Sequence, residues 1–288
     1  MKNAETEGSG LRVLADQYYT EDKNERQTYD LVIPESARGS TGLILCIHGG
    51  GWIMGDRSCY AGPLRQAGER GYAAAAINYR YVSETVCFGD LLDDIAAALT
   101  AIRAAGEEYG VRFDRALLTG VSAGGHLSLL YAYARRDAAP VRPVCVAELC
   151  GPTDLEDEMY HSPENAIARN AGADYMRGLL SRGVGHTVAP ACFEAARPAL
   201  KRYSPVNYVD ADAVPTFFGH GDRDDVVPYR NALALDERLT AAGVEHEFVS
   251  FPASGHACED KAAMARFMAL FFRCAARYLA PRGADAAL

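Results

Sequence analysis

The sequence predicts an α/β fold in which a mostly parallel sheet is covered by helices on both faces. Over the last three quarters of the chain, short β-rich runs alternate with longer helical stretches, which is the pattern of parallel strands joined by helical crossovers. One run, residues 43–47, is apolar at every position, as expected of a strand buried on both sides. Such a strand needs helices above and below it, so both faces of the sheet should be covered.

The same patterns predict each element in turn. Strands are expected at residues 29–34, 43–47, 72–78 (despite its alanines), 116–120, 144–149, 215–219 and 246–251. Helices are expected at residues 90–109, from about residue 123, at 229–242 and at 257–279. From residue 155 to 204 the pattern changes to helical pieces and glycine-containing turns. At the carboxyl ends of the strands this insertion would act as a lid, with a purely structural excursion as the alternative.

Length and composition favour an ordinary globular protein. The chain has 288 residues, 49% of them hydrophobic, so we expect residues 1–288 to form a single domain with a sizeable core. The formal net charge of −9 argues against nucleic acid as a partner and disfavours an anionic membrane. Residues 1–20 are polar, without a visible signal or membrane anchor. The polar residues 1–25 and the end of the chain, 281–288, are expected to be mobile.

Cysteine usage indicates the compartment. The eight cysteines include no C-x-x-C pair and no disulfide-like framework, and several lie inside apolar runs. Reduced thiols and a cytoplasmic location are therefore expected. The oligomeric state is not predicted.

A serine nucleophile is predicted at Ser122. Residues 120–124 read Gly-Val-Ser-Ala-Gly and fit G-x-S-x-G, after a predicted strand and before the helix that begins near Ala123. The strained turn at such a serine requires very small neighbours. The helix N-terminus behind it can stabilise negative charge on a substrate. A small-residue turn without chemistry is the alternative for this segment alone.

Three consecutive glycines follow the strand at 43–47, in the run His-Gly-Gly-Gly-Trp. Without Cβ atoms the main chain can approach a substrate closely, and its N–H groups can stabilise an oxyanion. We assign the donors to the amides of Gly50, Gly51 and Ala123, and expect Trp52 to shape the substrate pocket beside them. A phosphate loop fits less well because no Gly-Lys-Ser/Thr follows, and a flexible loop is the bland alternative.

The acid is predicted on the loop after the strand at 215–219. Three aspartates compete there. Spacing within the motif favours Asp224, with Asp225 as the alternative, while Asp222 fits a turn residue. The chosen acid should hold the imidazole of the base in the useful tautomer and stabilise the imidazolium.

The base is predicted to be His256. It lies in a turn after the strand at 246–251, where an imidazole can reach across to Ser122, whereas His246 starts that strand between two glutamates. His256 would take the serine proton during attack and return it to the leaving group.

These motifs together resemble the bacterial esterase branch of the α/β-hydrolases, near the hormone-sensitive-lipase-like enzymes and the feruloyl and acetyl esterases. The matching segments are 48–52 with 55–56, 78–80, 120–127, 151–154, 204–205, 220–228 and 255–256. The resemblance implies an eight-stranded sheet, an active site under a lid, a two-step acyl-enzyme mechanism and no cofactor. Asp225 stands where such motifs often have proline.

We therefore expect a carboxylesterase-type serine hydrolase that acts on small, short-chain or aromatic esters. The alternatives are an amide-cleaving relative, such as an arylformamidase or a peptidase, and a non-catalytic binding protein. No metal is expected, because His48 and His220 lack a partner at ligand spacing. His126 is expected to pack or hydrogen-bond rather than to catalyse. Six basic residues within 166–202 admit a carboxylate-bearing substrate, although a solvated helix face is the simpler explanation.

Overall fold

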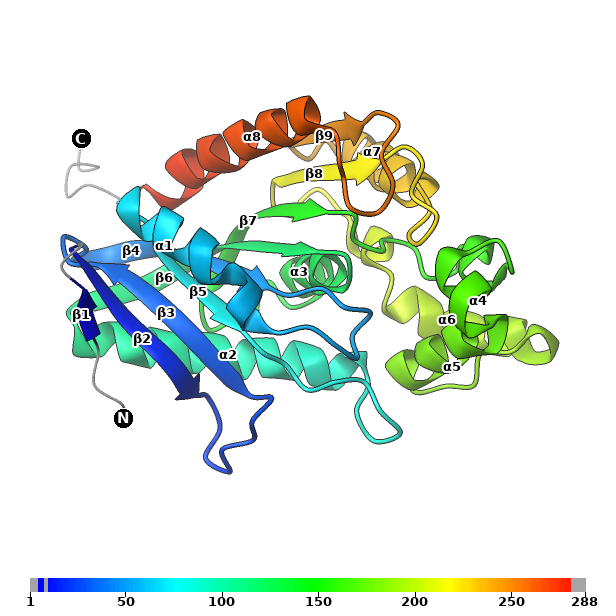
Figure 1. The fold of residues 1–288 in the computed structure, drawn as a ribbon, viewed down its shortest axis with the longest axis horizontal. Helices are drawn as coiled ribbons and strands as arrows, with labels where there is room; N and C mark the ends of the chain where they lie inside the picture. Colours follow the sequence, from blue (N-terminus) through cyan, green and yellow to red (C-terminus); the bar gives the residue numbers. More distant parts are fainter. Residues whose placement is uncertain (1–4, 8–9, 281–288) are drawn as a thin grey trace.

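The computed structural model describes residues 5–7 and 10–280 (Figure 1). The chain ends were expected to be mobile, and of these segments residues 1–4, 8–9 and 281–288 lie outside the described residues.

One mixed sheet of nine strands runs through the described residues, in the order β1-β2-β3-β5-β4-β6-β7-β8-β9. The strands are β1 (Glu5–Glu7), β2 (Leu11–Tyr18), β3 (Thr28–Pro34), β4 (Gly39–Ile47), β5 (Ala73–Ile77), β6 (Val111–Val121), β7 (Arg142–Leu149), β8 (Thr216–Gly221) and β9 (His246–Phe251). From β5 to β9 all neighbours are parallel, whereas β1, β2 and β3 add antiparallel pairs. Strands β2–β9 form the expected eight-stranded, mostly parallel sheet, and the three-residue β1 extends its edge.

Strand β2 corrects one expectation. Residues 11–18 lie within the segment expected to be mobile, yet they pair antiparallel with β3. Leu11 and Leu14 are buried, while most of the residues between and after them are partly or fully exposed. A strand with only two buried apolar side chains has too weak an alternation to stand out in the sequence.

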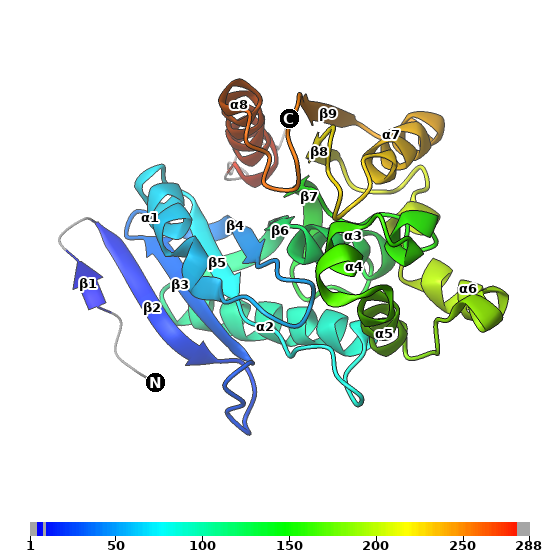
Figure 2. The ribbon, with the colours of Figure 1, turned by 45° about the vertical axis from the view of Figure 1, so that its right-hand side comes forward.

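Helices cover both faces of the sheet, as expected (Figures 1 and 2). The helices that cover the sheet are α1 (Ala61–Glu69), α2 (Phe88–Glu108), α3 (Ala123–Ala134), α7 (Arg230–Ala242) and α8 (Lys261–Leu279). Helices α1 and α8 pack on one face, and α2, α3 and α7 pack on the other. Within residues 5–7 and 10–280, none of the helices has the length and apolar character needed to cross a bilayer.

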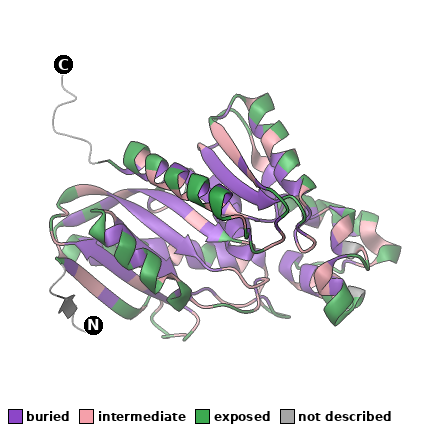
Figure 3. Cartoon of the chain, turned by 45° about the horizontal axis from the view of Figure 1, so that its top comes forward, coloured by how far each residue is buried: buried purple, intermediate pink, exposed green. Residues whose placement is uncertain are grey.

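Alternate residues of the central strands supply two separate cores. Along β4, Leu43 and Leu45 face the α2–α3 side, while Ile44 and Cys46 face the α1–α8 side. Both sets are nearly inaccessible to solvent. In Figure 3 the central strands are coloured mostly as buried, and the helices carry exposed residues along their outer sides. The run at 43–47 is apolar because each of its sides is covered.

A helical insertion separates β7 from β8. It contains α4 (Ala166–Ala171), α5 (Ala173–Val184) and α6 (Phe193–Arg202), with 3-10 turns η2 (Glu158–His161) and η3 (Pro190–Cys192). A further turn, η4 (Pro205–Tyr208), precedes β8, and η1 (Arg57–Tyr60) precedes α1. In Figure 1 the arrowheads of β6, β7 and β8 point toward this insertion. It therefore lies at the carboxyl edge of the sheet.

The strand register brings several loops to that edge together. Ile47 at the end of β4 is level with Gly120 of β6, and Val121 is level with Leu149 of β7. Farther along, Gly221 of β8 is level with Phe251 of β9. Because the strands are parallel, the loops that follow them meet at one place, where a shared site can form.

Candidate active site

Ser122 lies in a strained turn between β6 and α3. Its φ of 57° and ψ of −122° are outside the regions that residues with a side chain normally occupy, at a cost of about 1–3 kcal/mol. The backbone N–H of Ser122 donates to Leu149 O at 2.8 Å, which ties the turn to β7. A Cβ on Gly124 would collide with the backbone oxygen of Ile47. The small residue predicted after the serine is therefore required by close contact with β4.

Ser122, His256 and Asp224 form one hydrogen-bonded series. His256 Nε2 lies 2.9 Å from Ser122 Oγ, and His256 Nδ1 lies 2.7 Å from Asp224 Oδ2. A carboxylate oxygen can only accept, so Nδ1 carries the proton and Nε2 is left to accept from the serine hydroxyl. The structure thus brings together all three residues predicted from separate loops, and this is the arrangement that general-base activation of a serine requires.

Asp224 accepts three hydrogen bonds and lies close to a fourth nitrogen. Its Oδ1 accepts the N–H groups of Val226 and Val227, both at 2.9 Å. Its Oδ2 accepts from His256 and also lies 3.2 Å from Nε2 of the buried His220. Burial by itself would raise the pKa of Asp224, but the two histidines beside its carboxylate hold that pKa well below its usual range. The carboxyl group is therefore ionised at neutral pH.

Asp225, the alternative acid, points away from the imidazole. Its carboxylate pairs with Arg169 of α4 and is about half exposed. The backbone oxygen of Asp225 also accepts from Ala166 N at 2.8 Å. Adjacent residues of this turn therefore have different contacts: Asp224 faces the base and Asp225 joins the turn to the insertion.

Two supporting residues of the site were not identified from the sequence. His220 was considered only as a metal ligand, yet its Nε2–H donates to Val227 O at 2.9 Å beside the acid. Arg26 lies in the loop between β2 and β3, just after the segment expected to be mobile. Its guanidinium donates to His48 Nε2 at 3.0 Å. His220 lies four residues before Asp224, and this position could have indicated a residue that contacts the acid. Nothing in the sequence around Arg26 indicates its contact with His48.

The glycine-rich loop after β4 curves beside Ser122. Gly50 has a φ of +108° and Gly51 a φ of +58°, and a Cβ on Gly50 would collide with the backbone of Met54. In the part of the chain that the structure describes, the amides of Gly50, Gly51 and Ala123 have no acceptor outside their own helix or turn. They are therefore available as donors to an oxygen placed near Ser122.

His48 anchors this loop in a neutral form. Its Nδ1–H donates to Gly49 O at 2.8 Å, while Nε2 accepts from Arg26. Burial is the main cause that lowers the pKa of His48 to about 4, and the Arg26 charge adds to it. The ring also stacks on Tyr79, whose hydroxyl donates to His48 O at 2.9 Å. The hydrogen bonds and the ring contact of His48 with Arg26 and Tyr79 thus hold the glycine-rich loop in place.

Trp52 lies elsewhere than the predicted position beside the substrate. Its side chain is 3% exposed, packs against Phe88 and donates from Nε1 to His126 Nδ1 at 3.1 Å. His126 in turn donates from Nε2 to Tyr203 O at 2.7 Å, and burial lowers its pKa to about 4. His126 is therefore a neutral hydrogen-bonding residue, in line with the sequence analysis. Trp52 is buried in the core next to the glycine-rich loop and does not line the cavity.

A cavity of about 540 Å³ opens in front of Ser122 and His256. Its wall is largely apolar, with Ile53, Met54, Ile167, Tyr175, Leu179 and Val226 as the main side chains. Apart from His256, no Asp, Glu, Lys, Arg or His side chain of the described residues lines it. The site is sized and lined for a small, uncharged organic molecule.

Four of the six basic residues of the insertion pair with acidic side chains outside this cavity. Arg169 pairs with Asp225 and Arg177 with Asp174. Arg182 lies 3.5 Å from a glutamate of the 83–87 loop, and Arg197 contacts two more. Their positions fit the simpler expectation, a solvated face, and give no support to a carboxylate-bearing substrate.

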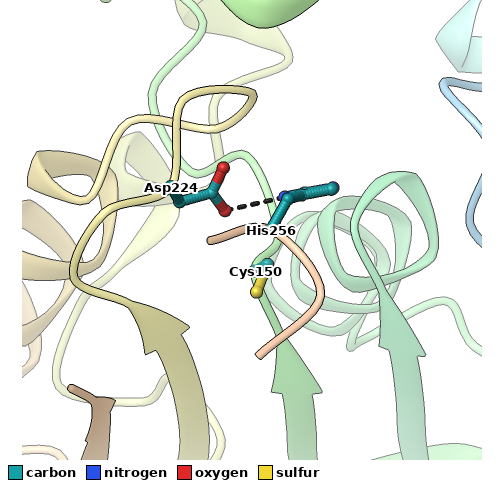
Figure 4. A group of neighbouring side chains, drawn as sticks. All are labelled: Cys150, Asp224 and His256. Atoms are coloured by element: carbon teal, nitrogen blue, oxygen red, sulfur yellow. Dashed lines mark hydrogen bonds and ion pairs between the residues drawn. The ribbon is translucent and has the colours of Figure 1, made fainter. Parts of the chain in front are cut away.

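One group of side chains has metal-ligand chemistry. The ligand atoms of Cys150, Asp224 and His256 all lie within 4.8 Å of one another (Figure 4). The Asp224–His256 pair is already hydrogen-bonded, and Cys150 Sγ contacts Cys258 Sγ. A metal ion would have to break both contacts, so this arrangement suits proton transfer better than metal binding.

Comparison with known proteins shows which family and which relatives the chain resembles. The sequence profile of the family described as BD-FAE matches residues 29–239. The chain is 32% identical over 213 residues to the probable carboxylic ester hydrolase LipM of Mycobacterium tuberculosis, covering 70% of this chain and 45% of LipM. It is 28% identical to carboxylesterase NlhH of the same organism, covering 77% and 68%. The chain thus spans about half the length of LipM.

Among solved structures, esterase B from Lactobacillus rhamnosis superposes with a TM-score of 0.71 at 23% identity. The match covers 92% of this chain and 85% of esterase B. This likeness shows the α/β-hydrolase fold, as predicted.

Proposed function

Because the chain belongs to the BD-FAE family, we propose that it hydrolyses carboxylic esters with Ser122 as the nucleophile. The names of the relatives LipM and NlhH support this reaction class. The observation that carries the proposal is the series Ser122–His256–Asp224, set beside a loop whose amides are free to bind an oxyanion.

In the first half-reaction, Ser122 Oγ attacks the ester carbonyl and His256 Nε2 takes its proton. Asp224 stabilises the imidazolium that forms and keeps Nδ1 protonated. The carbonyl oxygen becomes an oxyanion, which accepts from the amides of Gly50, Gly51 and Ala123. These donors are held in place before the reaction, so each contributes about 10²–10³-fold to the rate. The imidazolium then protonates the leaving alkoxide, and the acyl group stays on Ser122.

In the second half-reaction, a water molecule attacks the acyl-enzyme with His256 as general base. The same amides stabilise the second oxyanion, and collapse of the intermediate returns the proton to Ser122. No cofactor is needed for either step, because each consists of proton transfer and addition to a carbonyl.

The substrate class we propose is a small, uncharged ester with a short-chain or aromatic acyl group. The apolar wall of the cavity supports it, since burying a charged group there would leave that group without a partner. Tyr175, which is 39% exposed at this wall, offers a ring against which an aromatic acyl group can pack.

The insertion at residues 155–204 is proposed to act as a lid on a single domain of residues 1–288. Ile167, Tyr175 and Leu179, from α4 and α5, form part of the cavity wall above Ser122. A cytoplasmic location is also proposed, supported by eight cysteines that are all free thiols in the structure.

The test is a panel of p-nitrophenyl esters from acetate to palmitate, together with methyl ferulate and N-formylkynurenine. Wild type should turn over short-chain or aromatic esters, and Ser122→Ala should lower kcat by at least about 10⁴-fold with an unchanged Tm. Ser83→Ala, at an exposed serine outside the cavity, is the matched control and should behave as wild type. Cleavage of the formamide alone, or full activity of folded Ser122→Ala, would contradict the proposal.

A further inference from the structure

Two buried thiols meet beside the hydrogen bond between Asp224 and His256. Cys150 is the first residue after β7, and Cys258 follows His256 by two residues. Their Sγ atoms are 3.0 Å apart although the residues are separated by 108 positions in the chain. Both are buried, with Cys150 at 0% and Cys258 at 4% exposure. Figure 4 shows Cys150 next to Asp224 and His256, the proposed acid and base.

The two cysteines belong to parts of the structure that differ in their anchoring. Cys150 N donates to Gly219 O at 2.9 Å, which fixes this residue to β8 of the sheet. Cys258 N donates to Gly255 O at 3.2 Å, within the loop that carries His256. Both residues have positive φ angles, 53° and 50°, a conformation that residues with a Cβ adopt only under constraint. A bond between the sulfurs would therefore join the loop of the base to the rigid sheet.

We propose that Cys150 and Cys258 form a peroxide-responsive dithiol, whose disulfide displaces His256 and slows the enzyme. The sulfur atoms of a disulfide are about 2.05 Å apart, so the two Sγ atoms must approach by roughly 1 Å. Cys150 is anchored on the sheet, and the movement falls on the loop that carries Cys258 and His256. The displaced base loses its alignment with Ser122.

The chemistry requires a two-electron oxidant, and hydrogen peroxide is small enough to reach a nearly buried thiol. Cys258 sulfur attacks one peroxide oxygen and the O–O bond breaks. The departing hydroxide combines with the thiol proton to form water, and Cys258 becomes a sulfenic acid. Cys150 sulfur then attacks Cys258 sulfur, and the sulfenic hydroxyl departs with the Cys150 proton as a second water. In sum, two thiols are oxidised and one peroxide is reduced to two waters.

The order of attack follows from the surroundings of the two sulfurs. The hydrogen bond with Cys258 and burial both raise the pKa of the Cys150 thiol, and the nearby Asp224 carboxylate adds to this. A thiol that stays protonated reacts slowly with peroxide. Cys258 also has the greater exposure of the two, which makes it the attacking residue and Cys150 the resolving one.

The direct test is peptide mapping of the full-length protein before and after treatment with hydrogen peroxide. We expect a Cys150–Cys258 peptide pair two hydrogens lighter than the free thiols, which dithiothreitol converts back. Mapping needs no activity, so it is independent of the proposed ester hydrolysis. Recovery of both cysteines as free, alkylatable thiols after treatment would overturn the dithiol.

The effect on the base rests on the proposed function and is read from ester turnover. Closure should lower kcat by at least about tenfold, because a displacement near 1 Å can cost up to about 10²-fold, and dithiothreitol should restore it. Cys150→Ala and Cys258→Ala should each keep their turnover after peroxide. Cys59→Ser, at an exposed thiol elsewhere, should respond as wild type.

The outcomes separate the two proposals. A mapped disulfide with unchanged kcat would overturn the effect on His256, and so would equal inactivation of wild type and both alanine variants. A mapped disulfide in a protein that never turns over an ester would reject the proposed function and leave the dithiol intact.

Discussion

Replacing Asp224 by asparagine reverses the polarity of one atom facing His256. The Oδ1 position accepts the N–H groups of Val226 and Val227, each at 2.9 Å. An asparagine must therefore keep its oxygen on that side, since an amide NH₂ there would oppose two donors. Its NH₂ group then faces His256 Nδ1, where the carboxylate oxygen lies at 2.7 Å in the wild type. Two donors cannot share that contact, so the imidazole changes tautomer.

The expected loss in kcat for Asp224→Asn is about 10⁴-fold, which corresponds to roughly 5 kcal/mol of transition-state stabilisation. With the proton moved to Nε2, the imidazole presents N–H to Ser122 Oγ and cannot accept its proton. The imidazolium would also lack a counter-charge. The fold should change little, because asparagine has nearly the same shape and preserves the two bonds from the following amides.

Asp225→Asn is the matched control, one residue along the same turn. It weakens a half-exposed ion pair with Arg169, an interaction worth about 0–1 kcal/mol, so kcat should stay within about threefold of wild type. The assay is hydrolysis of p-nitrophenyl butyrate, with Tm measured by circular dichroism for each variant. Equal losses in the two variants, or a larger loss in Asp225→Asn, would refute the assignment of Asp224 as the acid.

Two further predictions concern stability. Gly124→Ala places a Cβ against the backbone oxygen of Ile47 and should lower Tm by at least about 5 °C. Gly62→Ala, at a helical glycine with open space around it, should leave Tm equal or slightly higher, and equal effects of the two would contradict the packing argument. Burial raises the pKa of Glu148 to about 8, whereas the unfolded chain has its ordinary value of 4.5, so stability from this group is lost as pH rises from 4.5 through 8. Glu148→Gln should therefore raise Tm relative to wild type more at pH 9 than at pH 5, and a difference independent of pH would refute this.

Local chemistry made much of the candidate site predictable. The turn around Ser122 and the run of glycines after β4 have short sequence signatures, because strained or closely packed backbone accepts only small residues there. The order of the loops that carry Asp224 and His256 followed from the alternation of strands and helices. The structure brings these three side chains within hydrogen-bond distance of one another.

Other features depend on contacts that no local pattern records. Strand β2 is stabilised by pairing with β3, and only two of its apolar side chains are buried. Trp52 was expected at the substrate pocket because it follows the glycines. The positive φ of 63° and the hydrogen bond to His126 instead bury it beneath the loop.

The sequence by itself determined the fold class and identified the candidate nucleophile, the candidate base and the glycine-rich loop. Their backbone conformations restrict which residues are allowed at each position, and that restriction is visible in the sequence. Only the tertiary structure showed that Asp224, and not Asp225, contacts His256, and that Cys150 lies against Cys258. These two contacts depend on the direction of side chains and on the packing of segments that are distant in the sequence. The residue types alone do not reveal which aspartate faces His256 or which cysteines meet.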